Sequence, residues 1–201
     1  MLVGDHMTRE IVMLSEDASV ADGLRLMSER GIHRLPVVDA DGNLLGIVSD
    51  MDLRIAEAAG RLADPLGAVM TKRVVTVSEY CPLEDAAALM RRKGIGGLPV
   101  VRGKQIIGII TDGDIFDVFS QLLGVGRPGV RLTVGVPGPS SDMLRLLNEL
   151  AERGGDIIGM GTLQDGNGRV AVVRVAGLSA ADARQAAEVT GVDLLDLLEE
   201  S

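Results

Sequence analysis

An internal duplication is the feature that most constrains this chain, because residues 7–53 recur with one small gap at residues 70–115. The shared segments are M-T, L-P-V-V and G-I-[VI]-[ST]-D-x-D, at residues 7–8, 35–38 and 46–52 of the first copy and 70–71, 98–101 and 108–114 of the second. A short repeat that cannot bury its own apolar face needs a neighbour. The duplication therefore predicts a pseudo-twofold pair of units, with clefts between them in which a ligand would bind.

Composition argues against a nucleic-acid partner. Aromatic residues make up 1% of the chain and there is no Trp, so the core is aliphatic and platforms for stacking bases are scarce. The formal net charge of −9 repels phosphate backbones. The one tight basic run, Arg91-Arg92-Lys93, falls in a predicted last helical turn, where cations suit the helix dipole.

The chain's one cysteine, Cys81, excludes an intramolecular disulfide and a thiolate metal site. It precedes Pro82 at a predicted helix start, a position that can lower a thiol pKa, but no His lies near it in sequence. No apolar run reaches the ~18–20 residues of a membrane span, and the first residues lack a secretory apolar segment. We therefore expect a soluble cytoplasmic protein with no membrane partner.

Each repeat reads as strand, helix, strand, strand, helix. Ser19 is placed to cap a helix that ends before Gly31, and Asp39-Ala40-Asp41-Gly42-Asn43 has the composition of a hairpin turn. Pro36 inside a strand predicts an edge position or a break in the ladder. In the first copy we predict strands at 11–14, 35–38 and 44–48, a helix at 19–30 and a second helix from Ser49 or Asp50 to about 59. In the second copy we predict strands at 74–77, 98–101 and 106–110 and helices at 83–93 and 112–122.

The last third of the chain follows a different plan, after a glycine-rich linker at residues 124–129. Strands are predicted at 131–136, 157–163, 169–175 and 192–198, helices at 140–153 and from Ser179 to 190, with a hairpin signal at 165–168. This βαββαβ order predicts a ferredoxin-like sandwich. The fold class is therefore α+β, with domains at 1–62, 63–123 and 130–201 and the linker between the last two.

The chemistry of the repeats is concentrated where the third strand of each meets a helix. Gly46 and Gly108 would let a ligand approach the backbone closely, and the hydroxyls of Ser49 and Thr111 lie where helix N–H groups favour an anion. Asp52 and Asp114 follow in the first helical turn. A carboxylate there can accept hydrogen bonds from the vicinal diol of a ribose, or it can cap the helix with no ligand present. Both interpretations remain open on these residues alone.

The repeats resemble a tandem pair of CBS domains, a family with the pattern M-T-x-x-h-h, G-h-x-x-L-P-V-V and G-h-h-[ST]-x-x-D, and the likeness covers nearly all of both copies. The resemblance implies an adenosyl ligand, such as AMP, ADP, ATP, S-adenosylmethionine or a cyclic dinucleotide, with or without Mg²⁺, and no other cofactor. Asp52 and Asp114 would hold ribose, with Ser49 and Thr111 near ribose or phosphate. The remaining implied ligand-binding residues flank adenine or phosphate: Thr8, Val12, His33, Arg34, Pro36, Thr71, Val75 and Pro99.

The two clefts are predicted to be chemically unequal. The positions before L-P-V-V hold His33-Arg34 in the first copy and Gly96-Gly97 in the second. Arg34 offers a fixed positive fork, and His33 could add a pH dependence near its ordinary pKa of ~6.5. We expect the cleft that these two residues reach to be the better one for charged phosphates; the alternative for His33 is a solvated loop residue.

The C-terminal segment resembles an ACT domain, a module that often binds amino acids. That family's first loop carries an acidic residue before Pro-Gly, whereas this chain reads Val136-Pro137-Gly138-Pro139, so a dimerising role is favoured over amino-acid binding. The joined arrangement is similar to acetoin-utilisation-type CBS–ACT proteins. The resemblance implies a homodimer and an unidentified regulated protein as partners.

The sequence is compatible with three functions. The leading one is a non-enzymatic regulator that senses an adenosyl ligand and changes shape. The second is a structural dimerisation module that binds nothing. The third is an enzyme with a D-x-D magnesium site at Asp50 and Asp52 or at Asp112 and Asp114, against which the chain shows no nucleophile or general-base motif.

Overall fold

The computed structural model describes residues 1–136, 140–166 and 168–200. It divides into two compact units, Met1–Ile115 and Phe116–Ser201, and the division falls inside helix α5 (Asp112–Leu122). The first unit holds both repeats, and the second holds the βαββαβ segment. The boundaries predicted for the individual domains stay a prediction.

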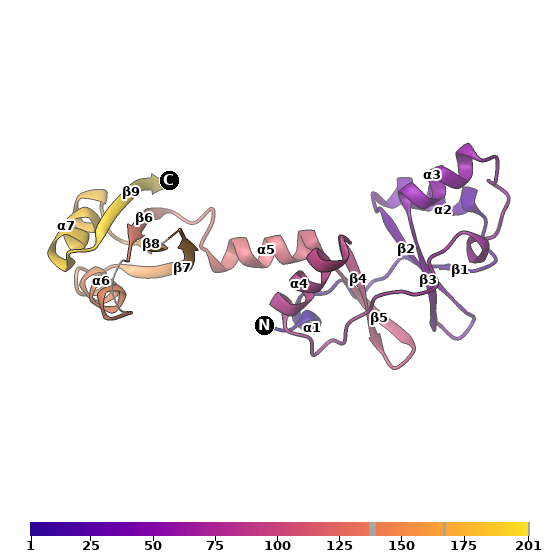
Figure 1. The fold of residues 1–201 in the computed structure, drawn as a ribbon, viewed down its shortest axis with the longest axis horizontal. Helices are drawn as coiled ribbons and strands as arrows, with labels where there is room; N and C mark the ends of the chain where they lie inside the picture. The colour runs from indigo at the N-terminus through magenta and orange to yellow at the C-terminus, as the bar shows by residue number, and fades with distance from the viewer. Residues whose placement is uncertain (137–139, 167, 201) are drawn as a thin grey trace. The chain divides into compact units, whose positions relative to one another are not determined.

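The first repeat is built on a small sheet with strand order β1-β2-β3 (Figure 1). Strand β2 (Arg34–Val38) pairs antiparallel with β3 (Leu44–Ser49) along its length. Strand β1 (Leu14–Ser15) runs parallel to β2 and pairs only with Val37 and Val38. Pro36 therefore lies just before these pairs, where β2 has a partner strand on one side only, as predicted for an edge position.

Two helices cover this sheet, and their ends are where the sequence places them. Helix α2 (Val20–Arg30) begins at the cap Ser19 and ends at Gly31, which adopts the left-handed conformation with φ 62° that glycine tolerates. Helix α3 (Asp50–Ala58) begins at the cap Ser49. The helices pack over an apolar core whose fully buried members include Leu35, Leu53 and Leu66, the last from the short helix η1 (Leu66–Ala68).

The second repeat reproduces this arrangement. Helix α4 (Leu83–Lys93) ends at Gly94, also left-handed, with Arg91, Arg92 and Lys93 in its last turn as predicted. Strands β4 (Gly97–Arg102) and β5 (Gln105–Thr111) form the antiparallel hairpin. The predicted strand at 74–77 is reduced to a single parallel bridge between Val77 and Val100. The predicted strand at 11–14 is likewise wrong over most of its length, because, of these four residues, only Leu14 pairs with β2.

The N-terminal segment packs on the second repeat although it precedes the first in sequence. In helix α1 (Val3–His6), the backbone N–H of Val3 donates to the carbonyl of Cys81 (2.9 Å), and that of Gly4 donates to the carbonyl of Glu79 (2.8 Å). Val3 is fully buried there. The chain thus ties the two repeats together from its first residues.

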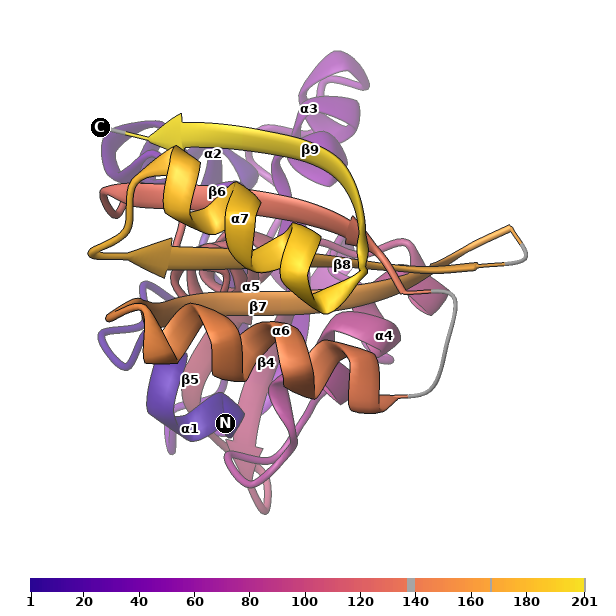
Figure 2. The ribbon, with the colours of Figure 1, turned by 90° about the vertical axis from the view of Figure 1, so that its left-hand side faces the viewer.

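The second unit forms one four-stranded antiparallel sheet with strand order β7-β8-β6-β9. Helices α6 (Ser140–Glu152) and α7 (Ala180–Thr190) cover the same face of it (Figure 2). The strands are β6 (Gly129–Gly135), β7 (Asp156–Asp165), β8 (Gly168–Ala176) and β9 (Asp193–Glu200). The predicted order of helices and strands is confirmed, and Ser179 caps α7 as expected. The loop at 137–139 and Asn167 of the hairpin signal lie outside the described residues.

Between this sheet and its helices lies a core of buried Val, Leu and Ala side chains together with Met143. Leu132 of β6 and Leu146 and Leu150 of α6 are fully buried, and Ala183, Ala186 and Ala187 let α7 approach closely. Within the described part of the chain, no helix is long and apolar enough to cross a membrane.

Candidate functional site

Two clefts form in the first unit because each M-T segment crosses to the other repeat. The backbone of Thr8 exchanges two hydrogen bonds with Ile109 of β5, at 2.9 and 3.0 Å. At the equivalent place, Thr71 exchanges two with Ile47 of β3, at 2.9 and 3.1 Å. Each cleft therefore combines the M-T segment of one repeat with the strand–helix junction of the other.

The larger cleft, which we call cleft 1, has a volume of about 460 Å³. That volume lies in the range of ~300–1,000 Å³ typical of small-molecule sites. Cleft 1 brings together seven of the residues predicted to bind a ligand: Thr8, Val12, His33, Arg34, Pro36, Thr111 and Asp114.

The smaller cleft, cleft 2, has a volume of about 140 Å³, below the range for a whole nucleotide. Its lining contains six of the predicted residues: Arg34, Ser49, Asp52, Thr71, Val75 and Pro99. All twelve predicted residues thus lie in one cleft or the other. Thr8 lies in the same cleft as Asp114, and Thr71 in the same cleft as Asp52, a crosswise grouping that the sequence did not indicate.

The carboxylates of Asp52 and Asp114 cap the helices on which they lie. Oδ2 of Asp52 accepts from the backbone N–H of Ser49 (2.9 Å) and from its hydroxyl (2.7 Å). Oδ2 of Asp114 accepts in the same way from Thr111, at 2.8 and 2.7 Å. Among the described residues, Oδ1 of either carboxylate has no hydrogen-bond partner. Capping therefore occupies one oxygen and leaves the other available to a ligand.

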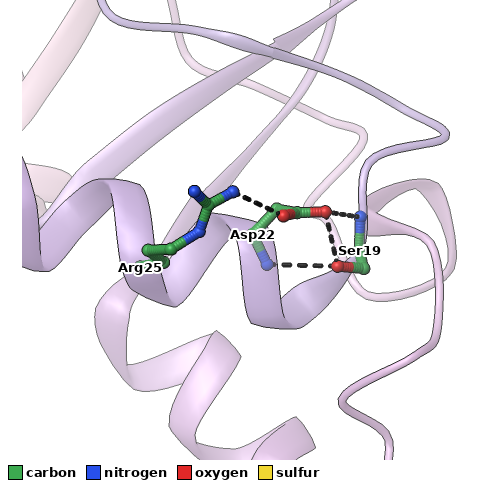
Figure 3. Close-up of polar contacts among 3 residues, drawn as sticks. All are labelled: Ser19, Asp22 and Arg25. Carbon is green, nitrogen blue, oxygen red and sulfur yellow. Dashed lines mark hydrogen bonds and ion pairs between the residues drawn. The ribbon is translucent and has the colours of Figure 1, made fainter.

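The same cap occurs outside the two clefts. At the start of α2, the hydroxyl of Ser19 donates to Oδ2 of Asp22 (2.7 Å), and the backbone N–H of Asp22 donates to the Ser19 hydroxyl (3.1 Å), as Figure 3 shows. The hydrogen bonds from Ser19 and Arg25 lower the pKa of Asp22. Neither Ser19 nor Asp22 lines a cleft. The S/T-x-x-D pattern alone is therefore a capping signal, and position decides which Asp can bind a ligand.

Gly46 and Gly108 serve packing between the repeats, which corrects the prediction that they admit a ligand. A Cβ built on Gly108 would collide with the sulfur of Met7 and lie 2.9 Å from its Cγ. A Cβ on Gly46 would collide with the sulfur of Met70 and lie 2.8 Å from its Cγ. The Met of each M-T segment thus fills the space over the glycine of the opposite repeat.

Arg34 and His33 both line cleft 1, as predicted, and Arg34 lines cleft 2 as well, which the sequence did not indicate. A Cβ built on Gly97 would lie 3.5 Å from Cδ of Arg34, and one on Gly96 would lie 3.6 Å from its Nη2. The Arg34 side chain therefore lies against these two glycines, within ordinary contact distance of where a Cβ would be. His33 lines cleft 1 alone and is largely exposed, with Nδ1 3.6 Å from Oδ2 of Asp50.

Three charged residues of the clefts were missed in the sequence. Glu10 and Asp112 line cleft 1, and Arg73 lines cleft 2. Glu10 and Arg73 follow the two M-T pairs at the same offset, so comparison of the repeats could have shown opposite charges at one position. By its lining side chains cleft 2 holds two arginines and one Asp, whereas cleft 1 holds three acidic residues beside Arg34 and His33.

Cys81 does not have the lowered pKa that its place near a helix start suggested. Burial raises the pKa of the thiol, and the negative charges of Asp85 and Glu84 raise it further. No group of three or more His, Cys, Asp or Glu suited to a metal ion occurs in the ranges that the structure describes.

A family model of the CBS domain matches residues 3–59 and 66–121, which together span more than half of the chain. A CBS domain-containing protein of Dictyostelium discoideum is 34% identical over 136 residues, which are 61% of this chain and 94% of that protein. A homoserine O-acetyltransferase of Methanohalobium evestigatum is 37% identical over 114 residues, 56% of this chain. This match spans only 23% of the acetyltransferase.

Solved structures resemble the same part of the chain. A Vibrio cholerae protein named for acetoin utilization (AcuB) is 36% identical, with a TM-score of 0.58 over 62% of this chain and 94% of that one. The CBS domain pair of protein MJ0100, solved with 5′-methylthioadenosine and S-adenosyl-L-methionine, is 29% identical, with a TM-score of 0.56 over 60% and 96%. CBSX2, solved with AMP, is 32% identical, with a TM-score of 0.55 over 58% and 94%. From its duplicated sequence, its paired repeats and these matches, the chain belongs to the CBS domain family.

Proposed function

We propose that this chain is a regulatory protein that senses an adenosyl ligand, with cleft 1 as the principal site. The observation that carries the proposal is the crosswise exchange of the M-T segments, which gathers all the predicted ligand-binding residues into two clefts. Cleft 1 is large enough for a nucleoside with at least one phosphate. The structural relatives solved with AMP or with S-adenosyl-L-methionine support this class of ligand.

The carboxylate of Asp114 would hold the ribose. Its Oδ2 is fixed by the cap with Thr111, so the side chain is already oriented before a ligand arrives. Its Oδ1 can then accept a hydrogen bond from a ribose hydroxyl, and charge-assisted bonds of this kind contribute roughly 1.5–3 kcal/mol. Val12 and Pro36 supply apolar walls for the base. Asp52 would act in the same way in cleft 2, which has to widen before it admits a whole nucleotide.

Signalling would follow from the ligand's contact with both repeats. Because cleft 1 is lined by residues of each repeat, a bound nucleotide stabilises the relative placement of the two that fits it best. A ligand shifts a conformational equilibrium only by its difference in affinity for the two states. The regulated partner would therefore respond to the relative placement of the two repeats.

For the second unit we propose an ACT-like, ferredoxin-like domain that dimerises the chain in the cytoplasm. Its βαββαβ order and antiparallel sheet order β7-β8-β6-β9, with both helices on one face, support this assignment. Sedimentation equilibrium of the whole chain tests it, because a homodimer has twice the mass of the 21.1 kDa chain. A monomer at micromolar concentration would contradict it.

A structural module without a ligand is the second candidate, and one observation favours it: the carboxylates of Asp52 and Asp114 already serve as caps, as that of Asp22 does. Thermal unfolding with adenosine, AMP, ADP, ATP and S-adenosylmethionine, with and without Mg²⁺, separates the two. A ligand at 100 times its dissociation constant stabilises by ~2.7 kcal/mol.

Three matched variants complete the test: Asp114→Ala, Asp52→Ala and Asp22→Ala. Each loses the carboxylate that bonds back to the Ser or Thr three residues earlier, so each should lower the unfolding free energy by roughly 0.3–1.5 kcal/mol. Asp22→Ala also loses the exposed pair with Arg25. The sensor predicts that Asp22→Ala keeps the full ligand-induced shift and that Asp114→Ala loses most of it. If no compound stabilises the folded wild type, the structural module is the better description.

A further inference from the structure

Among the residues that the structure describes, Arg34 alone lines both clefts. We infer that the two clefts share this single guanidinium, so that two phosphate-bearing ligands compete for it and bind with negative cooperativity. The inference rests on the proposed function and adds to it the rule by which the sites interact.

Comparison of the two repeats shows that Arg34 has no counterpart in the second repeat. The positions that match His33-Arg34 are Gly96-Gly97, and Gly97 is buried. A Cβ at either glycine would touch the space that Arg34 fills, at 3.5 Å from Cδ or 3.6 Å from Nη2. A Cβ at Gly96 would in addition lie 2.8 Å from Oδ2 of Asp112. The second repeat therefore places no counterpart of Arg34 between the clefts, and the arginine of the first repeat lies against the two glycines.

The charges that surround Arg34 indicate that phosphate binding in either cleft would depend on its guanidinium. Cleft 1 contains Glu10, Asp112 and Asp114, so without Arg34 its lining would repel a phosphate. In cleft 2, Arg73 faces a phosphate as well, and Arg34 would supply the second guanidinium. A guanidinium pairs most strongly with a phosphate through a bidentate fork of fixed geometry. The side chain cannot take the rotamer that best fits a phosphate in cleft 1 and the one that best fits a phosphate in cleft 2 at the same time. The first anionic ligand consequently takes Arg34, and the second binds without it.

Two ligands distinguish this sharing from a simple difference between the clefts. Adenosine has no phosphate, so the ratio of its two dissociation constants measures only how unequal the clefts are in shape. AMP adds one phosphate to the same nucleoside. The sharing predicts that the ratio for AMP exceeds the ratio for adenosine by roughly ten- to a hundredfold, the value of one charge-assisted hydrogen-bonded contact.

The experiment is isothermal titration of the whole chain with adenosine and with AMP, for the wild type, Arg34→Gln and Arg25→Gln. Arg34→Gln should weaken the first AMP step and leave the second and both adenosine steps nearly unchanged, so that the two ratios become equal. Arg25→Gln removes a positive charge from the exposed pair with Asp22, outside both clefts, and should change neither ratio.

The outcomes separate the inference from the function on which it rests. Equal ratios for AMP and adenosine in the wild type would overturn the sharing while the sensor stands. So would an excess for AMP that persists in Arg34→Gln, because repulsion between two bound phosphates would then be the cause. If neither compound binds the wild type, the proposed function fails and the sharing fails with it.

Discussion

The contact between Gly108 and Met7 is the part of the interface between the repeats whose energy can be worked out most directly. Gly108 is buried in β5, and a Cβ there would collide with the sulfur of Met7 and lie 2.9 and 3.2 Å from its Cγ and Cε. Met7 is itself only 7% exposed, so its flexible side chain has little room to retreat. Adding a methyl group to such a packed site costs roughly 1–3 kcal/mol.

Gly108→Ala should therefore lower the unfolding free energy of the first unit by roughly 1–3 kcal/mol. Gly113→Ala is the matched control, because the nearest atom to its Cβ would be the Thr111 hydroxyl at 3.6 Å, an ordinary contact. Gly113 lies in α5, where Ala is favoured over Gly by about 0.5–1 kcal/mol, so this change should leave stability equal or higher.

Removing the methionine isolates the clash. Met7→Ala alone should cost roughly 2–5 kcal/mol, as for other buried methionines. In the double variant Gly108→Ala/Met7→Ala, the added methyl group no longer meets the Met7 side chain. The cost of the double variant should therefore be lower than the sum of the two single costs, by a coupling energy of roughly 1–3 kcal/mol. Additive costs, or a Gly108→Ala variant as stable as the wild type, would refute the packing argument.

Urea unfolding followed by far-ultraviolet circular dichroism is the suitable assay, because the chain has no Trp and a single Tyr. A change in stability appears as a shift in the midpoint at an unchanged slope. Since the chain has two compact units, two transitions are expected. Leu146→Ala, in the core of the second unit, should shift only the transition of that unit. The other transition then belongs to the first unit.

Two further predictions follow from the pKa shifts. Burial and the charges of Asp85 and Glu84 raise the pKa of Cys81, so iodoacetamide should alkylate it more slowly at mildly alkaline pH in the folded chain than in urea; equal rates would contradict this. Hydrogen bonds from the side chain and backbone of Asn43 lower the pKa of Asp39 below its ordinary 3.8, so its contribution to the hairpin turn is present above that value and lost as the pH falls through the lower folded pKa. Carboxyl NMR of Asp39 should show a midpoint below 3.8, and a midpoint at or above it would be contrary to the hydrogen-bond geometry.

Local sequence signals predicted the helices and hairpins well. The caps Ser19, Ser49 and Ser179 and the left-handed Gly31 and Gly94 mark helix ends because they satisfy backbone groups within a few residues of themselves. Such signals need no knowledge of the rest of the fold. The duplication added the long-range information that two such units pair.

Pairing between distant segments could not be predicted in the same way. The segments 11–14 and 74–77 are apolar enough for strands, but only Leu14, Ser15 and Val77 meet a partner strand. The crossing of Thr8 to Ile109 and of Thr71 to Ile47 exchanges the M-T segments, and no local pattern indicates it. These contacts depend on which surfaces the paired repeats bring together.

The sequence by itself therefore determined the two-copy architecture, the ends of the helices and the set of residues proposed to bind a ligand. The tertiary structure decided how that set is divided: Asp114 with Thr8, Asp52 with Thr71, and Arg34 in both clefts. It also showed that Gly46 and Gly108 pack against Met70 and Met7 of the opposite repeats. The physical reason is that capping and turn formation act within a few residues, whereas a cleft exists only where surfaces far apart in sequence meet.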